Sequence, residues 1–125
     1  MGTNDATHGS NTYFFDRCLG WQGVCVEPHP SYHAKIALKR SCSLTKTCIA
    51  ESGVFVNFSF KGSRAGPTSH IIPRGSRPIP GEDGVVTELR CTRLSQLARQ
   101  QRVSRVNFMS LDIEGAELTA LRSID

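Results

Sequence analysis

The sequence lacks the patterns that mark several large classes of protein. Its apolar runs are short, far below the roughly 18 residues that a membrane-spanning helix requires. Its first residues lack the charged-then-apolar order of a signal peptide. Its glycines do not form the GxGxxG fingerprint of dinucleotide-binding enzymes. We therefore expect a soluble protein that is not an NAD-dependent oxidoreductase.

The cysteines also lack a recognised spacing. No two of them form a CxxC pair, their number is odd, and several lie in strand-like apolar surroundings. They are Cys18, Cys25, Cys42, Cys48 and Cys91. This pattern does not predict a zinc site. It favours buried free thiols in a reducing compartment, so we expect a cytoplasmic protein.

The other groups that commonly form metal sites or nucleophiles are scattered. His29 and His33 flank the start of a predicted helix, but no carboxylate or cysteine stands at ligand spacing from them. No Ser/His/Asp or Cys/His order suggests a catalytic nucleophile. We predict neither a metal site nor nucleophilic catalysis.

The length and charge fit one modest globular domain. The chain has 125 residues, of which 38% are hydrophobic and 21% charged. The formal charge of +4 is uneven, because residues 61–105 hold nine Lys or Arg and three acids. Such a segment could face a phosphate-bearing substrate or nucleic acid. Since no aromatic residues are interleaved with these charges, we favour a solvated loop and helix face and do not expect a nucleic-acid partner.

The first part of the chain predicts alternating helices and strands. Residues 1–11 predict a loop, and Ser10 or Asn11 can cap a helix over 12–19. Short β-branched runs predict strands over 23–27 and 43–50, with a helix over 30–40 between them. The helix over 30–40 should bury one face and expose another. The expected buried residues are Tyr32, Ile36 and Ala37, and the expected solvated ones are Lys35, Lys39 and Arg40.

The second part continues the alternation around one irregular segment. Residues 54–60 alternate apolar and polar, which predicts a half-exposed antiparallel strand, and residues 61–84 are rich in Gly, Pro, Ser and Arg and predict a long loop. A strand over 85–89, a helix over 93–101 capped by Thr92, a buried strand over 105–112 and a helix over 114–123 follow. This order predicts an α/β fold with a parallel sheet covered by helices.

Three acids fall where such a sheet binds ligands, at the carboxyl ends of its strands. Glu27 ends one strand, Asp112 ends another, and Asp5 lies in the loop before the first helix. A carboxylate in the position of Glu27 can accept hydrogen bonds from both hydroxyls of a ribose. A solvated turn acid beside Pro28 explains it equally well, so the residues alone leave both interpretations open.

The acids near the end of the chain have a simpler explanation. Asp is a preferred helix cap, and acids in a first turn complement the helix dipole. This is sufficient for Glu117. Asp112 differs because a cap does not require a carboxylate to emerge from an apolar strand at the ligand edge.

Two ordered motifs resemble the FkbM-type methyltransferases. The first is "GTNDATHGSNTYFFDRCLGWQGVCVEPHP" and the second "FMSLDIEGAELTALRSID". The matching residues are Gly2, Asn4, Asp5, Ser10, Asn11, Thr12, Gly20, Trp21, Glu27, Pro28, Asp112, Glu114, Gly115 and Glu117. The resemblance implies a Rossmann-like class I methyltransferase sheet with helices on both faces. It also implies S-adenosylmethionine as cofactor and a hydroxyl of a small molecule or sugar as methyl acceptor.

The same resemblance implies roles for individual residues. Gly2, Asn4 and Asp5 would line the methionine end of the cofactor, and Glu27 would hold its ribose hydroxyls. Asp112 and Glu114 would border the cofactor and acceptor, with Asp112 positioning or deprotonating the acceptor hydroxyl.

The chain departs from the family pattern in two ways. Ala6 stands where the family usually has a second glycine. The family's first strand and its last strands have no counterpart here, so we expect residues 1–125 to form a partial domain with the loop at 61–84. The departures leave an alternative open, a non-catalytic interaction protein that retains part of the fold.

Overall fold

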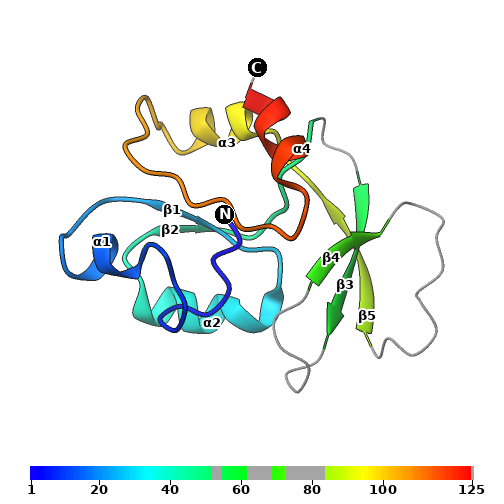
Figure 1. Cartoon of the computed structure of the whole chain (residues 1–125), viewed down its shortest axis with the longest axis horizontal. Coiled ribbons are helices and arrows are strands. Elements are labelled where there is room, and N and C mark those ends of the chain that lie inside the picture. The colour runs from blue at the N-terminus through cyan, green and yellow to red at the C-terminus, as the bar shows by residue number, and fades with distance from the viewer. Residues whose placement is uncertain (52–54, 62–68, 73–83, 125) are drawn as a thin grey trace.

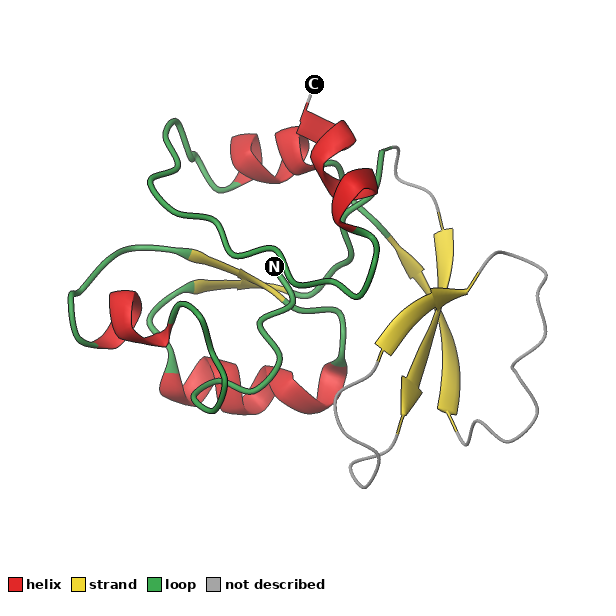
Figure 2. Cartoon of the chain, viewed as in Figure 1, coloured by secondary structure: helices red, strands yellow, loops and turns green. Residues whose placement is uncertain are grey.

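The computed structural model describes residues 1–51, 55–61, 69–72 and 84–124, and side chains outside 52–87 (Figure 1). Helices and strands are mixed along these residues (Figure 2). Their order is α1 (Tyr13–Arg17), β1 (Val24–Val26), α2 (Pro30–Lys39), β2 (Ser43–Thr45), β3 (Phe55–Lys61), β4 (Ser69–Ile72), β5 (Gly84–Arg90), α3 (Leu94–Gln100), α4 (Glu117–Leu121) and the 3-10 helix η1 (Arg122–Ile124).

A small parallel sheet forms the centre of the molecule. β1 pairs with β2 in parallel, from Val24 opposite Ser43 to Val26 opposite Thr45, and α2 connects the two strands. Pro30 favours the start of α2 because its fixed φ suits the first turn, and the His29 ring accepts the Ser31 N–H at 3.2 Å. The predicted strand–helix–strand order over 23–50 is confirmed, although β2 is shorter than the predicted strand.

Helices cover both faces of this sheet (Figure 1). Neighbouring strand residues point to opposite faces. Cys25 accordingly packs with Ile36 of α2, and Val26 packs with Leu97 of α3 and Ala120 of α4. The mixed arrangement with a parallel sheet is compatible with the predicted α/β fold, and the complete Rossmann-like sheet stays a prediction.

A second, antiparallel sheet has the order β4-β3-β5 (Figure 2). β3 is antiparallel to both neighbours, as the sequence predicted, but the side chains of the predicted alternation over 54–60 lie outside those described. The predicted loop over 61–84 is wrong at β4. Its backbone groups pair with β3, from Asn57 opposite Ile72 to Phe60 opposite Ser69, and this pairing overrides the weak local pattern.

The prediction of buried free thiols is wrong for four of the cysteines. Cys25 and Cys42 form a disulfide with Cα atoms 5.7 Å apart, and Cys48 and Cys91 form another with Cα atoms 4.4 Å apart. The fold brings together cysteines that are 17 and 43 residues apart in sequence, which spacing rules do not reveal. Cys18 is exposed and unpaired. Since disulfides persist in oxidising compartments, the cysteines no longer support a cytoplasmic location.

The buried strand predicted over 105–112 is also wrong. The segment is irregular, and Val106, Phe108 and Met109 are exposed. A strand needs backbone partners along its edge. Among the described residues, Met1 alone provides them around residue 111, because the Met1 ammonium donates to the Ser110 carbonyl and the Asp112 N–H donates to the Met1 carbonyl.

The start of α3 differs from the predicted cap at Thr92. Arg93 is the N-cap, and the hydroxyl of Ser123 accepts the Leu94 N–H at 2.9 Å. Ser123 is buried in η1, so η1 supplies the cap that local sequence does not. No helix in the described part of the chain is long and apolar enough to cross a membrane.

Candidate functional site

Three segments meet at the carboxyl end of β1. The N–H groups of Gly2 and Thr3 both donate to the Val26 carbonyl, at 3.1 and 3.3 Å. Met1 is bonded to Ser110 and Asp112 on its other side. The loop that begins at Gly2 is therefore fixed between β1 and the segment that leads to α4, at the strand edge where the sequence predicted a ligand.

Gly2 is required by the close approach of two backbones. Its φ is +68°, and a Cβ there would lie 1.8 Å from the carbonyl oxygen of Asp112. No side chain fits at that distance, and the left-handed conformation disfavours other residues. Gly2 thus allows the loop to lie directly against Asp112.

Glu27 is buried rather than solvated, so the interpretation as a solvated turn acid is wrong. The residue is only 5% exposed. One carboxylate oxygen accepts the Asn4 N–H at 2.7 Å and the other accepts the His29 N–H at 2.8 Å. Each oxygen keeps a further lone pair. Glu27 therefore fixes the loop and retains acceptor capacity for hydroxyl groups.

The Met1 ammonium lies near this carboxylate. Burial lowers the pKa of the Met1 amino group, and the negative charges of Glu27 and Asp112 oppose that shift. The Met1 amino group and the Glu27 carboxylate are thus both shielded from water, whereas Asp112 is exposed.

Asp5 is used within its own loop. One oxygen accepts the N–H groups of Thr7 and His8, both at 2.9 Å, and the other pairs with Lys35 of α2. The Lys35 ammonium, followed by the Thr7 and His8 N–H groups, holds the pKa of Asp5 well below its usual range. The carboxylate thus braces the loop against α2, while Asn4, at φ +51°, turns its N–H toward Glu27.

The acids from 112 to 117 separate into different positions. α4 begins only at Glu117, so Asp112 does not cap it. Glu117 accepts the N–H groups of Ile113 and Gly115 at 3.0 and 3.2 Å. Its own backbone N–H, followed by those of Ile113 and Gly115, lowers the pKa of its carboxyl group. Glu117 thereby holds the turn in which Glu114 is exposed at φ +55°. Asp112 is also exposed, beside Gly2.

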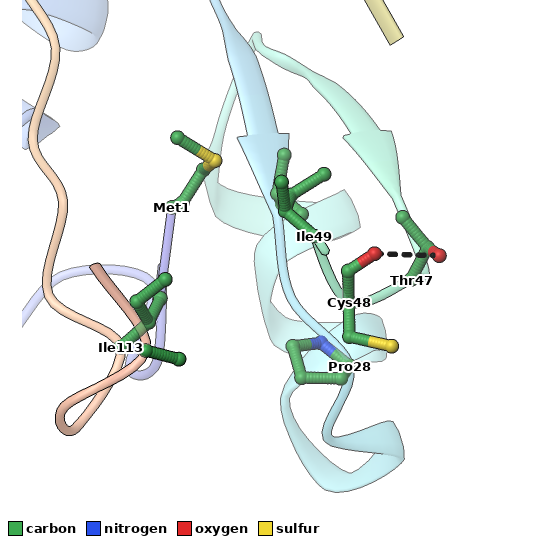
Figure 3. Close-up of a pocket in the computed structure, with 9 residues that line it drawn as sticks. Met1, Pro28, Thr47, Cys48, Ile49 and Ile113 are labelled. Atoms are coloured by element: carbon green, nitrogen blue, oxygen red, sulfur yellow. Dashed lines mark hydrogen bonds between the residues drawn. The ribbon is translucent and has the colours of Figure 1, made fainter. Parts of the chain in front are cut away.

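A small cavity lies between these segments (Figure 3). Its volume is about 30 Å³. Figure 3 shows Met1 and Ile113 on one side and Pro28, Cys48 and Ile49 on the other. The lining residues are Met1, Gly2, Val26, Pro28, Thr47, Cys48, Ile49, Ile113 and Ala116.

The residues at this edge fit a nucleoside in kind. Mainly apolar side chains line the cavity, and such side chains suit the flat face of a purine. Pro28, one of the lining residues, directly follows Glu27, whose carboxylate oxygens can accept hydrogen bonds. The cavity is large enough for a water molecule but not for a nucleoside. A nucleoside would fit here only if the Met1 and Ile113 side moved away from the Pro28 and Ile49 side.

The structure brings some predicted site residues together and separates others. Gly2, Asn4 and Glu27 converge with the backbone of Asp112, whereas the Asp5 carboxylate turns to α2 and Glu114 points from an exposed turn. Sequence reasoning missed the wall formed by Thr47, Cys48 and Ile49. The only sequence signal for these three residues was their position near the end of the strand predicted over 43–50.

A buried ion pair behind the loop was also missed. The Arg40 guanidinium contacts the Asp16 carboxylate, and both residues are buried. The prediction that Arg40 is solvated is therefore wrong. Its partners lie more than 20 residues earlier in the chain, so a local helix pattern could not identify them.

Within the ranges that the structure describes, no group of three or more His, Cys, Asp or Glu could hold a metal ion. The family model described as the methyltransferase FkbM domain matches residues 1–125. No curated protein and no solved structure matches the chain. The family match covers all the segments that meet at this edge of the sheet.

Proposed function

Because the chain belongs to the FkbM methyltransferase domain family, we propose that its site binds S-adenosylmethionine and serves methyl transfer to a hydroxyl oxygen of a small molecule or sugar. The observation that carries this proposal is the buried carboxylate of Glu27 at the end of β1. A buried carboxylate is costly unless it is hydrogen-bonded, and two backbone N–H groups hold this one. Its spare lone pairs suit the two hydroxyls of a ribose.

The loop residues have distinct parts in this proposal. Gly2 brings the backbone close to Asp112, and Asn4 ties the loop to Glu27, so both would position the methionine end of the cofactor. Asp5 acts indirectly, since its carboxylate already holds Thr7, His8 and Lys35. The apolar wall at Val26, Pro28 and Ile49 would take the purine.

Asp112 and Glu114 face solvent at the same edge and are our candidates for the acceptor side. When bound, the cofactor supplies a methyl group on a sulfonium, which an aligned oxygen can attack. The Asp112 carboxylate would orient the acceptor hydroxyl and accept its proton. Glu114 would border the cofactor and acceptor.

The role of Glu27 is tested by Glu27→Gln, which preserves the shape of the side chain and an oxygen for one N–H. Hydrogen bonds to a charged group contribute about 1.5–3 kcal/mol, so the Kd for S-adenosylmethionine should rise by about 10- to 100-fold. Isothermal titration calorimetry of the folded chain measures this change.

The matched control is Glu51→Gln, because Glu51 is an exposed glutamate outside the site. The Kd of the Glu51→Gln variant for S-adenosylmethionine should equal that of the unaltered chain. Saturable binding that Glu27→Gln leaves unchanged would remove Glu27 from the cofactor site.

A second candidate function is that of a non-catalytic interaction protein. Several aromatic rings lie together at the surface. The ring centroid of Phe15 is 4.8 Å from those of both Trp21 and Phe108. Phe14, Trp21 and Phe108 are 58%, 43% and 49% exposed. Exposed apolar patches often mark protein interfaces. A folded chain whose melting temperature does not change with S-adenosylmethionine would favour this candidate.

A further inference from the structure

Arg40 binds a loop rather than solvent. It is the C-cap of α2 and is 7% exposed. Besides Asp16, its guanidinium donates to the Ser10 hydroxyl at 2.9 Å and to the Thr12 hydroxyl at 2.8 Å. It also reaches the Ala6 carbonyl at 3.4 Å.

These acceptors belong to one stretch that has little regular structure of its own. Residues 1–12 contain no helix or strand, and Ala6 in their middle is fully buried. Ser10 and Thr12 belong to the Ser-Asn-Thr motif, which has no contact with the cavity at the end of β1. Their two hydroxyls bind Arg40, and the amide of Asn11 donates to the Ser110 hydroxyl at 3.1 Å. The motif therefore anchors the loop on two sides.

The two cations of α2 hold this loop with different strength. Lys35 pairs with Asp5, but their side chains are 47% and 29% exposed, so solvent screens the pair. The Arg40 and Asp16 side chains are only 1% and 6% exposed. Arginine presents five N–H donors in a rigid plane, and Arg40 distributes them over the loop and Asp16. A lysine could not span these acceptors.

We propose that Arg40 is a positioning residue for the cofactor-binding loop, acting through Ser10, Thr12 and the Ala6 carbonyl. This role rests on the proposed function. The start of the loop is fixed by Glu27 through Asn4, and its far part is fixed by Arg40. Together they keep the Gly2 to Asp5 backbone at a set distance from Glu27, so that binding does not have to order the loop.

The test uses the double variant Ser10→Ala with Thr12→Val, which removes two acceptors of Arg40 but keeps its pair with Asp16. The Kd for S-adenosylmethionine should rise at least fivefold in a chain whose circular dichroism is unchanged. Hydrogen exchange of the amides of residues 7–11 should accelerate, while exchange in β1 and β2 stays the same. The control Arg17→Ala removes an exposed contact to Ser41 and should change neither readout.

The outcomes separate this role from the proposed function. A folded double variant that melts at a lower temperature but binds with unchanged Kd would overturn the positioning role and leave the function intact. Failure of the unaltered chain to bind would overturn both. If the double variant does not fold, the single variants Ser10→Ala and Thr12→Val decide by the same readouts, each with a smaller rise in Kd expected.

Discussion

Replacing Asp16 by alanine should lower the free energy of unfolding by about 3–5 kcal/mol. The change removes the counter-charge of a guanidinium that the fold excludes from water, and the uncompensated charge is more costly than the pair was favourable. It also removes the acceptor of the Ser41 N–H, which lies 3.2 Å from the Asp16 carboxylate. That hydrogen bond fixes the backbone directly after Arg40. α1, α2 and the loop before α1 should all loosen together.

Urea denaturation followed by circular dichroism measures this loss. The matched control is Lys35→Ala, which removes the exposed ion pair to Asp5 and should cost about 0.2–1 kcal/mol. A loss for Asp16→Ala no larger than that of the control would show that the buried pair does not hold this part of the fold.

Removing the disulfide between Cys48 and Cys91 should destabilise the chain by about 4 kcal/mol, the chain-entropy value for a closed loop of about this length. The bond joins residues 43 apart in sequence, and the antiparallel sheet lies between them. Beside it, Ile49 and Thr92 form a parallel bridge. The bond therefore joins the two ends of the stretch of chain that contains β3, β4 and β5.

Two measurements check this disulfide. Alkylation under denaturing conditions without reductant, followed by mass spectrometry, should label Cys18 alone. Urea denaturation of the double variant Cys48→Ser with Cys91→Ser should show the loss of stability, whereas Cys18→Ser should show almost none because Cys18 is exposed. Labelling of all five cysteines would restore the expectation of free thiols in a reducing compartment.

The sequence predicted those parts of the fold whose signal is local. The strand–helix–strand unit around α2, the strand β5 and the helix α3 follow from runs of apolar residues and their period. These patterns do not depend on distant residues, so the structure retained them.

Features that depend on tertiary contacts could not be predicted in the same way. Residues 105–112 are apolar enough for a strand, but in the part of the chain that the structure describes their backbone bonds only to Met1. Likewise β4 forms because β3 offers it an edge, and the start of α3 is capped by Ser123 from far along the chain. The composition of a segment does not reveal which distant residues will pair with it.

The candidate site divides in a similar way. Position at a strand end identified Glu27, and the structure added that it is buried and bonded to Asn4 and His29. The same reasoning could not show that Asp5 is committed to Lys35 or that Arg40 supports the loop, because both contacts span 30 residues or more between a helix and a loop.

Cofactor binding is tested most directly by titrating the isotope-labelled chain with S-adenosylmethionine and recording the amide signals in two-dimensional NMR spectra. Saturable shifts should concentrate at residues 2–5, at Glu27 and His29, and at residues 113–114, and the exposed residues of α3 should not respond. The absence of saturable shifts, or shifts confined to the aromatic surface around Trp21 and Phe108, would contradict a cofactor site at the end of β1.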